Sequence, residues 1–573
     1  MKRTLMSRPA WLLFAALALA AVPAGAGAPK YVVFPFNNLG MHCTDNDFSI
    51  FSLLPPFNTL HAQVIQVGPV PVVLTSNEVQ VVFQAMTDGT GSINTCSAPQ
   101  VPKTNFWQYA FSLFGVNLAP DDGIEGVKMP GTVNAWGPLT FESNMRWFAA
   151  NGIPITPTDD AGNFNPYPMM KVAVGPNPGP ADGTPVTLPI SWEAHCDVCH
   201  ETGSDGASPG FYGVPEFSAA DDPVIRVRQN ILTLHDAINK TALTANEPVL
   251  CASCHYSAAL DLAGTGPKGT QINPATGQPY SYESHALHRH HGSPQVNDVV
   301  PIPDEGVNTC YYCHPGPTTK CLRGAMSTAG IICQNCHGGL LAVGSVNRKP
   351  WIDTPRCQSC HTGDAIAHLG KDLIRRIAFT GSADRARPIV SPNKRFAENR
   401  GSSTTCDVQL YRDSMGHPGA DGIPKIACSA CHGSPHAEWP LTDPAANDNA
   451  TPVALQGYAG TIMECSVCHG DGYLAPQGKE LSGPHGIHTV NHQDWWGVSA
   501  VDHKVFLANN PDALGQCRAC HGKDLGGTPY SRVRTTRIFF TGPMQMNTLV
   551  VPLGTQISCS QCHASPEVRV LER

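Results

Sequence analysis

Charged residues are scarce in this chain of 573 residues. Asp, Glu, Lys and Arg together make up 14% of it, against about a quarter in ordinary globular proteins. The charge that is present is mostly acidic, with 45 acidic and 37 basic side chains. An acidic surface repels phosphates, so the composition argues against nucleic acid as a partner.

Long apolar runs are missing beyond the first residues. Residues 1–26 read as a secretory signal, with a basic start at Lys2 and Arg3, an apolar stretch over residues 11–22 and a small-residue cleavage site at residues 24–26. That stretch is short for a bilayer span and no second one follows, although a retained anchor is the alternative. We expect an exported protein whose contact with a membrane is at most peripheral.

No Cys-x-x-Cys pair in the chain lacks a histidine directly after its second cysteine, and this Cys-x-x-Cys-His motif occurs nine times. We number the motifs one to nine in chain order. Their thiols are Cys196 and Cys199, Cys251 and Cys254, Cys310 and Cys313, Cys333 and Cys336, Cys357 and Cys360, Cys428 and Cys431, Cys465 and Cys468, Cys517 and Cys520, and Cys559 and Cys562. Their histidines are His200, His255, His314, His337, His361, His432, His469, His521 and His563.

The spacing within each motif has a chemical reason. Two thiols three positions apart can add to the two vinyl groups of one haem, and the next residue then reaches the iron as its proximal ligand. Structural zinc sites also use Cys-x-x-Cys pairs, but they place no demand on the residue after the second cysteine. A disulfide scaffold favours longer loops. The motifs therefore predict a multihaem c-type cytochrome with nine covalently attached haem c groups.

Residues 27–190 carry no motif and contain short β-branched runs bounded by Gly, Pro and Asn. We expect an N-terminal all-β domain, built as a sandwich or a barrel. A Pro- and Gly-rich stretch at residues 175–183 predicts its boundary. The expected strands are residues 64–67, 70–74, 79–83, 124–129 and 171–174.

Residues 191–573 hold all nine motifs at irregular spacing, and 54 Gly and 51 Pro residues in the whole chain favour loops. We expect a loop-rich, mostly α-helical or irregular domain organised around stacked haems. The close succession of His314, His337 and His361 implies that three haems lie near one another. Two segments are predicted to be helical: residues 224–235 place apolar side chains at helical spacing, and residues 281–291 carry four histidines in eleven residues.

Of the 24 histidines, fifteen lie outside the motifs, enough to give every iron a second imidazole. Irons with two imidazole ligands have no open position for a substrate, whereas methionine ligation would raise the potential. Two pairs, 288/291 and 485/488, are spaced so that a helical turn points both rings to one side, where each can reach a different haem. The favoured distal ligands are His195, His235, His288, His291, His417, His436, His485, His488 and His503, with His285, His290 and His492 as weaker candidates and His368 in reserve.

Four cysteines lie outside the motifs. An even number in an exported protein favours two disulfides, Cys43–Cys96 and Cys321–Cys406. A copper site at residues 41–43 is the alternative for Cys43, but three adjacent residues rarely converge on one ion. Asp45 and Asp47 lack the full pattern of a calcium loop, so we expect them in a turn.

At several stretches the chain resembles the large multihaem c-type cytochromes of metal-reducing and related bacteria. These stretches are residues 38–43, 234–236, 248–255, 333–338, 428–436 and 483–488. The resemblance implies an exported protein, at the outer surface or else in the periplasm, that passes electrons to extracellular acceptors such as metal oxides or to partner cytochromes. It also leaves open a homo-oligomer or filament.

The expected role is that of an electron carrier, not an enzyme. The alternative is a multihaem oxidoreductase that reduces nitrite, hydroxylamine or a sulfur oxyanion at an iron with an open side. Such enzymes often mark that iron with a lysine variant of the motif, and the chain contains no Cys-x-x-Cys-Lys. A third interpretation makes the N-terminal domain a docking module.

Overall fold

The computed structural model describes part of the chain. The described residues are 30–97, 102–257 without 144 and 180, 260, 272–273, 276–297, 302, 307–350 without 347 and 349, 357, 426–470, 487–490, 495, 503–511, 514–541 without 523, and 547–561. The expected signal segment, 1–26, lies outside these residues.

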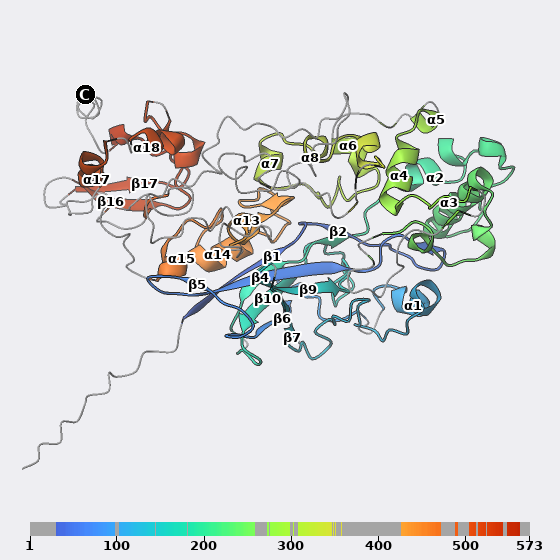
Figure 1. Ribbon diagram of the computed structural model, residues 1–573, viewed down its shortest axis with the longest axis horizontal. Helices are drawn as coiled ribbons and strands as arrows, with labels where there is room; N and C mark the ends of the chain where they lie inside the picture. The colour runs from blue at the N-terminus through green and yellow to red at the C-terminus, as the bar shows by residue number, and fades with distance from the viewer. Residues whose placement is uncertain are drawn as a thin grey trace, which may run out of the picture.

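The N-terminal region forms two antiparallel sheets that pack face to face in the lower half of the molecule in Figure 1. The first sheet has the order β1-β4-β9-β8, with β5 added on β4; its strands are Tyr31–Asn37, Asn58–Gln66, Trp147–Ile153, Thr140–Glu142 and Val72–Val73. The second has the order β11-β10-β6-β7, with strands Thr184–Thr187, Met169–Val174, Val81–Met86 and Gly137–Pro138.

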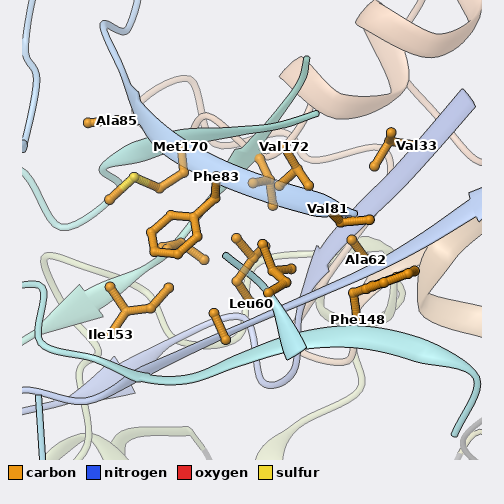
Figure 2. Packing of buried hydrophobic residues seen from close by; sticks show 14 of the residues in the cluster. Val33, Leu60, Ala62, Val81, Phe83, Ala85, Phe148, Ile153, Met170 and Val172 are labelled. Atoms are coloured by element: carbon orange, nitrogen blue, oxygen red, sulfur yellow. The ribbon is translucent and has the colours of Figure 1, made fainter. Parts of the chain in front are cut away.

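One apolar core joins the two sheets. Alternate residues of a strand point to opposite faces, so Leu60, Ala62 and Val64 of β4 all enter this core. Phe83 of β6 and Met170 of β10 meet them from the other sheet, as Figure 2 shows. Burying such side chains is worth about 1.5–3 kcal/mol each, and the core therefore fixes the two sheets against each other.

The opposite face of the first sheet is also buried. Phe36 of β1 and Trp147 of β9 lie in a second apolar cluster with Ala430, from α13 (Cys428–His432) of motif six. The Gln63 side chain on the same face accepts a hydrogen bond from the backbone N–H of Ala427, at 2.9 Å. The sheet is thus covered on one face by the second sheet and on the other by a motif.

Two expected strands differ from the structure. Residues 124–129 lie in turns, with one isolated bridge between Asp122 and Lys128. The run 70–74 forms only the two-residue strand β5. In both stretches Gly or Pro interrupts the apolar run, which favours turns over a ladder. The other strand and helix bounds of this region are β2 His42–Cys43, β3 Phe51–Ser52, α1 Phe106–Phe114 and β12 Ile190–Ser191.

The remainder consists of short helices and hairpins between loops. Both predicted helices are confirmed, as α3 (Pro223–Asn239), which Asp222 caps, and α4 (Glu283–His291). Motif helices are α2 Asp197–His200, η4 Cys251–Ser253, α6 Val307–Tyr311, α8 Cys333–His337, α13, α15 Ser466–His469, α18 Leu514–His521 and η13 Cys559–Gln561. The others are η1 Asp205–Ala207, η2 Phe211–Gly213, η3 Leu243–Ala245, β13 Val249–Leu250, α5 Pro294–Asn297, α7 Ala325–Thr328, α9 Leu340–Val343, β14 Gly433–Ser434, β15 Ala437–Glu438, α14 Ala450–Gln456, α17 His503–Asn509, η11 Pro529–Ser531, β16 Arg537–Thr541 and β17 Asn547–Val551.

A buried ion pair and a buried arginine tie the N-terminal segment to the motif-bearing region. Arg228 of α3 contacts Asp45 at 3.1 Å. Arg323 contacts Asp448 at 2.9 Å and donates to the backbone carbonyl of Gly40 at 2.5 Å. The parallel bridges β12–β2 and β13–β3 add backbone hydrogen bonds across the same junction. These contacts hold the motifs against the sheets.

The motif helices follow the long axis of the molecule in Figure 1, from α2, next to α4, at one end, through α6, α8, α13 and α15, to α18 at the other. The two sheets lie beneath the middle of this row. Within the described residues, no helix combines the length and apolarity needed to cross a bilayer.

Candidate haem-binding sites

Most motifs in the described part of the chain form a helical turn. The backbone N–H of the motif histidine donates to the carbonyl of the first cysteine in several motifs: His200 to Cys196 at 2.8 Å, His255 to Cys251 at 3.0 Å, His314 to Cys310 at 2.9 Å, and His469 to Cys465 at 2.9 Å. This bond closes an α-helical turn. The turn brings both thiols and the imidazole of a motif to one side, as attachment of a single haem requires.

Four motif histidines face a histidine from elsewhere in the chain, at ring-centre distances that agree within half an ångström. The pairs are His200 with His291 at 6.4 Å, His314 with His288 at 6.1 Å, His337 with His436 at 6.2 Å, and His521 with His488 at 6.5 Å.

This spacing fits one iron between two rings. Imidazole–metal bonds of about 2 Å on each side, plus about 1 Å from each nitrogen to its ring centre, put two opposite rings roughly 6 Å apart. The two His of α4 that lie one turn apart serve different motifs: His288 faces motif three and His291 faces motif one. The residues present therefore fit axial pairs of haem iron.

Hydrogen bonds to Nδ1 leave the other ring nitrogen for a metal. Nδ1 lies 2.7 Å from the Ser284 carbonyl in His288 and 2.8 Å from the Leu287 carbonyl in His291. A carbonyl can only accept, so Nδ1 carries the proton and Nε2 keeps its lone pair. His488 and His521 have the same arrangement, with Nδ1 2.9 Å from the Thr489 carbonyl and 3.0 Å from the Ile557 carbonyl. Such bonds fix the tautomer and the orientation of metal-ligating histidines.

Loss of solvent favours the neutral form of several of the paired histidines. Desolvation lowers the pKa of His288 and of His337 to about 3, with a smaller contribution from the facing histidine in each case. It likewise lowers the pKa of His200, His436 and His488 to about 4. Only a neutral imidazole binds a metal, so this electrostatic environment favours ligation at ordinary pH.

The other favoured distal ligands in the described residues are not among these four facing pairs. His235 of α3 has Nδ1 2.9 Å from the Thr241 hydroxyl, and desolvation and then nearby His255 of motif two lower its pKa. His195 donates its backbone N–H to the Tyr312 carbonyl in motif three, while its Nε2 is 3.4 Å from the Glu193 carboxylate. His503 has Nδ1 2.8 Å from the Trp495 carbonyl. His417 and His485 lie outside the described residues, as do Cys360, His361, Cys562 and His563.

Two other histidines use Nε2 within the protein. In His285 it lies 2.8 Å from the Arg348 carbonyl, and in His42 it lies 2.7 Å from the Asn38 side-chain oxygen. These bonds occupy the nitrogen that a haem ligand would use, so both residues have structural roles here. His290 is near His291 and His235, and both of these lower its pKa after desolvation does. His368 and His492 lie outside the described residues.

The predicted Cys43–Cys96 disulfide is wrong, because both residues are free thiols. Cys43 ends β2 and lies close enough to Cys321 for that thiol to raise its pKa, after desolvation. Cys96 is instead buried near Thr95 and Lys103. Cys321 is also a free thiol, and Cys406 lies outside the described residues.

Asp45 and Asp47 take part in turns. One Asp45 carboxylate oxygen accepts from the backbone N–H groups of Leu53 and Leu54, at 2.8 and 2.9 Å. Asp47 accepts from the backbone N–H of Ser49 at 2.9 Å. Within the described part of the chain no cluster of three or more His, Cys, Asp or Glu side chains has the geometry of a bare metal site.

Thiols of different motifs lie close together. Cys310 of motif three and Cys333 of motif four are hydrogen-bonded, as are Cys357 of motif five and Cys428 of motif six. In three further pairs of motifs, a thiol of one motif is near enough to raise the pKa of a thiol in the other. These are motifs three and one (Cys313 and Cys196), motifs seven and six (Cys468 and Cys431), and motifs eight and nine (Cys517 and Cys559). Haems attached through these thiols would therefore be close neighbours.

Comparison with known proteins agrees with this chemistry. Over 244 residues the chain is 25% identical to the C-type polyheme cytochrome OmcB of Geobacter sulfurreducens, in two strains. The match covers 36% of this chain and 32% of the relative, so the chain spans about a third of the relative's length. No family model matches, and no solved structure matches. The similarity supports a multihaem electron-transfer protein with covalently bound haem c.

Proposed function

We propose that the protein is an exported c-type cytochrome with nine haems that conducts electrons along a row of closed sites. Its acceptors would be extracellular, either metal oxides or partner cytochromes. The observation that carries the proposal is the set of four imidazole pairs, each of which joins a motif histidine to a second histidine at 6.1–6.5 Å.

An imidazole on each side of an iron leaves no position for a small substrate. Haem supplies one-electron transfer when it is bound. The contribution of the chain is to hold the sites close, to close their axial positions and to set their potentials through ligands, hydrogen bonds and burial. This division of labour favours an electron carrier over a reductase of nitrite, hydroxylamine or sulfur oxyanions.

The order of sites follows from the contacts between motifs. Motifs one, three and four are linked by thiols and by α4. His436, four residues after His432 of motif six, faces His337 of motif four, so the β14–β15 hairpin joins those two. Motifs five and seven both adjoin six through thiols. We infer one continuous row from motif one to motif seven in which motif five is a side branch at six.

Motif two and the C-terminal motifs extend this row. His290 lies near both His235, beside motif two, and His291, which faces motif one. At the other end Arg537 of β16 pairs with Glu464, directly before motif seven, and motifs eight and nine adjoin each other. The row thus has an end at motif two and an end at motifs eight and nine, where partners can exchange electrons.

The N-terminal sheets support the row. α13 of motif six packs on the first sheet, and the backbone carbonyl of Cys468 in motif seven accepts from Gly68 at 3.2 Å. Sites on a rigid scaffold keep their spacing more accurately than sites on loops. A support of this kind serves a carrier whose rate depends on the separation of fixed sites.

The proposal is tested on the mature protein from a host that attaches haem c. Its intact mass should equal the chain plus nine haems, and the ferric protein should be low-spin and bind little cyanide. Reduced protein should be reoxidised by ferric chelates without saturable turnover of nitrite or hydroxylamine. Eight haems or fewer would overturn the predicted number of haems. Turnover of these substrates at roughly 1–1000 per second would transfer the assignment to the oxidoreductase class.

A further inference from the structure

Cys321 touches an axial histidine although it belongs to no motif. Its Sγ lies 3.6 Å from Nδ1 of His436, within the range of a hydrogen bond to sulfur. The His436 ring centre is 6.2 Å from that of His337 in motif four. The thiol therefore lies behind the ring that closes site four.

The direction of this hydrogen bond follows from the pairing. If Nε2 of His436 faces the iron, Nδ1 carries the proton and donates it to the sulfur. Sulfur is a weak acceptor. In His288, His291 and His488 the same nitrogen donates to a backbone carbonyl oxygen, a stronger acceptor, at 2.7–2.9 Å.

The contact belongs to a well-anchored segment. The backbone N–H of Arg323, two residues after Cys321, donates to the His436 carbonyl at 2.9 Å. The Arg323 guanidinium binds the Cys321 carbonyl at 3.3 Å and the Asp448 carboxylate at 2.9 Å. Cys321 also packs against the apolar cluster that contains Met41. These contacts hold the backbone next to Cys321, its side chain and His436 in place.

We propose that Cys321 is a positioning residue that raises the reduction potential of site four. The inference rests on the axial pairing of His337 and His436 in the proposed function. A strong acceptor at Nδ1 makes an imidazole more electron-rich and stabilises oxidised iron, which lowers the potential. A weak sulfur acceptor does this less, so site four holds an electron more firmly than a site whose ligand donates to a carbonyl.

The test replaces the acceptor and leaves the ligand in place. Cys321→Ser puts a stronger oxygen acceptor near Nδ1, and one component of a spectroelectrochemical titration should move to lower potential while the protein stays low-spin. Cys321→Ala, which removes the acceptor, should move no component downward. Cys43→Ser is the matched control, since it changes the neighbouring thiol and should leave every component in place.

The outcomes separate this inference from the proposed function. His436→Ala should produce one high-spin haem; if it does not, the axial pairing itself is wrong. If it does, and Cys321→Ser shifts no component or Cys43→Ser shifts the same one equally, only the role of Cys321 is overturned. A loss of attached haem in Cys321→Ser, read from the intact mass, would assign the residue to folding of the site and would also overturn the proposal.

Discussion

Helix α4 allows a sharp test of axial ligation, because it carries histidines of different kinds within three turns. His288 faces His314 at 6.1 Å, with its Nδ1 bound to a carbonyl. We predict that His288→Ala opens one iron of the nine and leaves the other ligands in place. About one ninth of the low-spin signal of the ferric protein should then convert to high-spin.

His285 on the same helix is the matched control. It is 3% exposed, and its Nε2 binds the Arg348 carbonyl at 2.8 Å. His285→Ala should cost about 1 kcal/mol for the hydrogen bond, plus the packing of the ring, yet every iron should stay low-spin. His291→Ala should open a second iron, and the double variant with His288→Ala should show about two ninths, because the two rings serve different motifs.

Low-temperature EPR, together with the high-spin absorption band, measures these fractions directly. Cyanide added to His288→Ala should restore the low-spin signal, since the open position then takes an external ligand. A fully low-spin His288→Ala protein, or a high-spin haem in His285→Ala, would refute the assignment of ligands on α4.

Two further predictions concern stability. Desolvation raises the pKa of Glu283 to about 8 from an ordinary 4.5. Because the unfolded chain releases this proton at lower pH than the folded protein, the free energy of unfolding should fall as pH rises between these values, by at most about 1.4 kcal/mol per pH unit. Glu283→Gln should remove the fall in melting temperature between pH 5 and 8. An unchanged slope would contradict this. Asp448→Asn removes the carboxylate that pairs with buried Arg323 and should lower the free energy of unfolding by denaturant by about 3–5 kcal/mol. Lys128→Gln breaks an exposed ion pair and should lower it by under about 1 kcal/mol. Equal losses of stability in the two variants would contradict the role given to burial.

The sequence predicted local features better than pairings. The period of apolar residues predicted α3, and the histidine-rich run at residues 281–291 predicted α4. The three-residue spacing of His288 and His291 indicated that two rings on one turn could serve two motifs. The partner of each ring depends on contacts between distant segments, as when the β14–β15 hairpin carries His436 away from motif six to face motif four. Spacing along the chain contains no such information.

The cysteines outside the motifs show the same limit. Counting them predicted Cys43–Cys96, but β2 places Cys43 near Cys321, which is far away in sequence. No sign of the contact between Cys321 and His436 is present in the sequence either, because nothing in the residues around Cys321 distinguishes it from other cysteines outside the motifs. The expected strand at residues 124–129 failed for a local reason, since Gly126 adopts a left-handed φ of 82° that a turn requires.

The first sheet is covered on its outer face by residues that are synthesised late. Its outer face binds Ala427 through Gln63, a contact that spans 364 positions of the chain. During synthesis this apolar face stays uncovered until residues 426–468 have been made. Exposed strands of this kind favour aggregation, and long-range contacts form slowly. Production of the protein therefore depends on protecting the uncovered face of this sheet until the C-terminal motifs have folded against it.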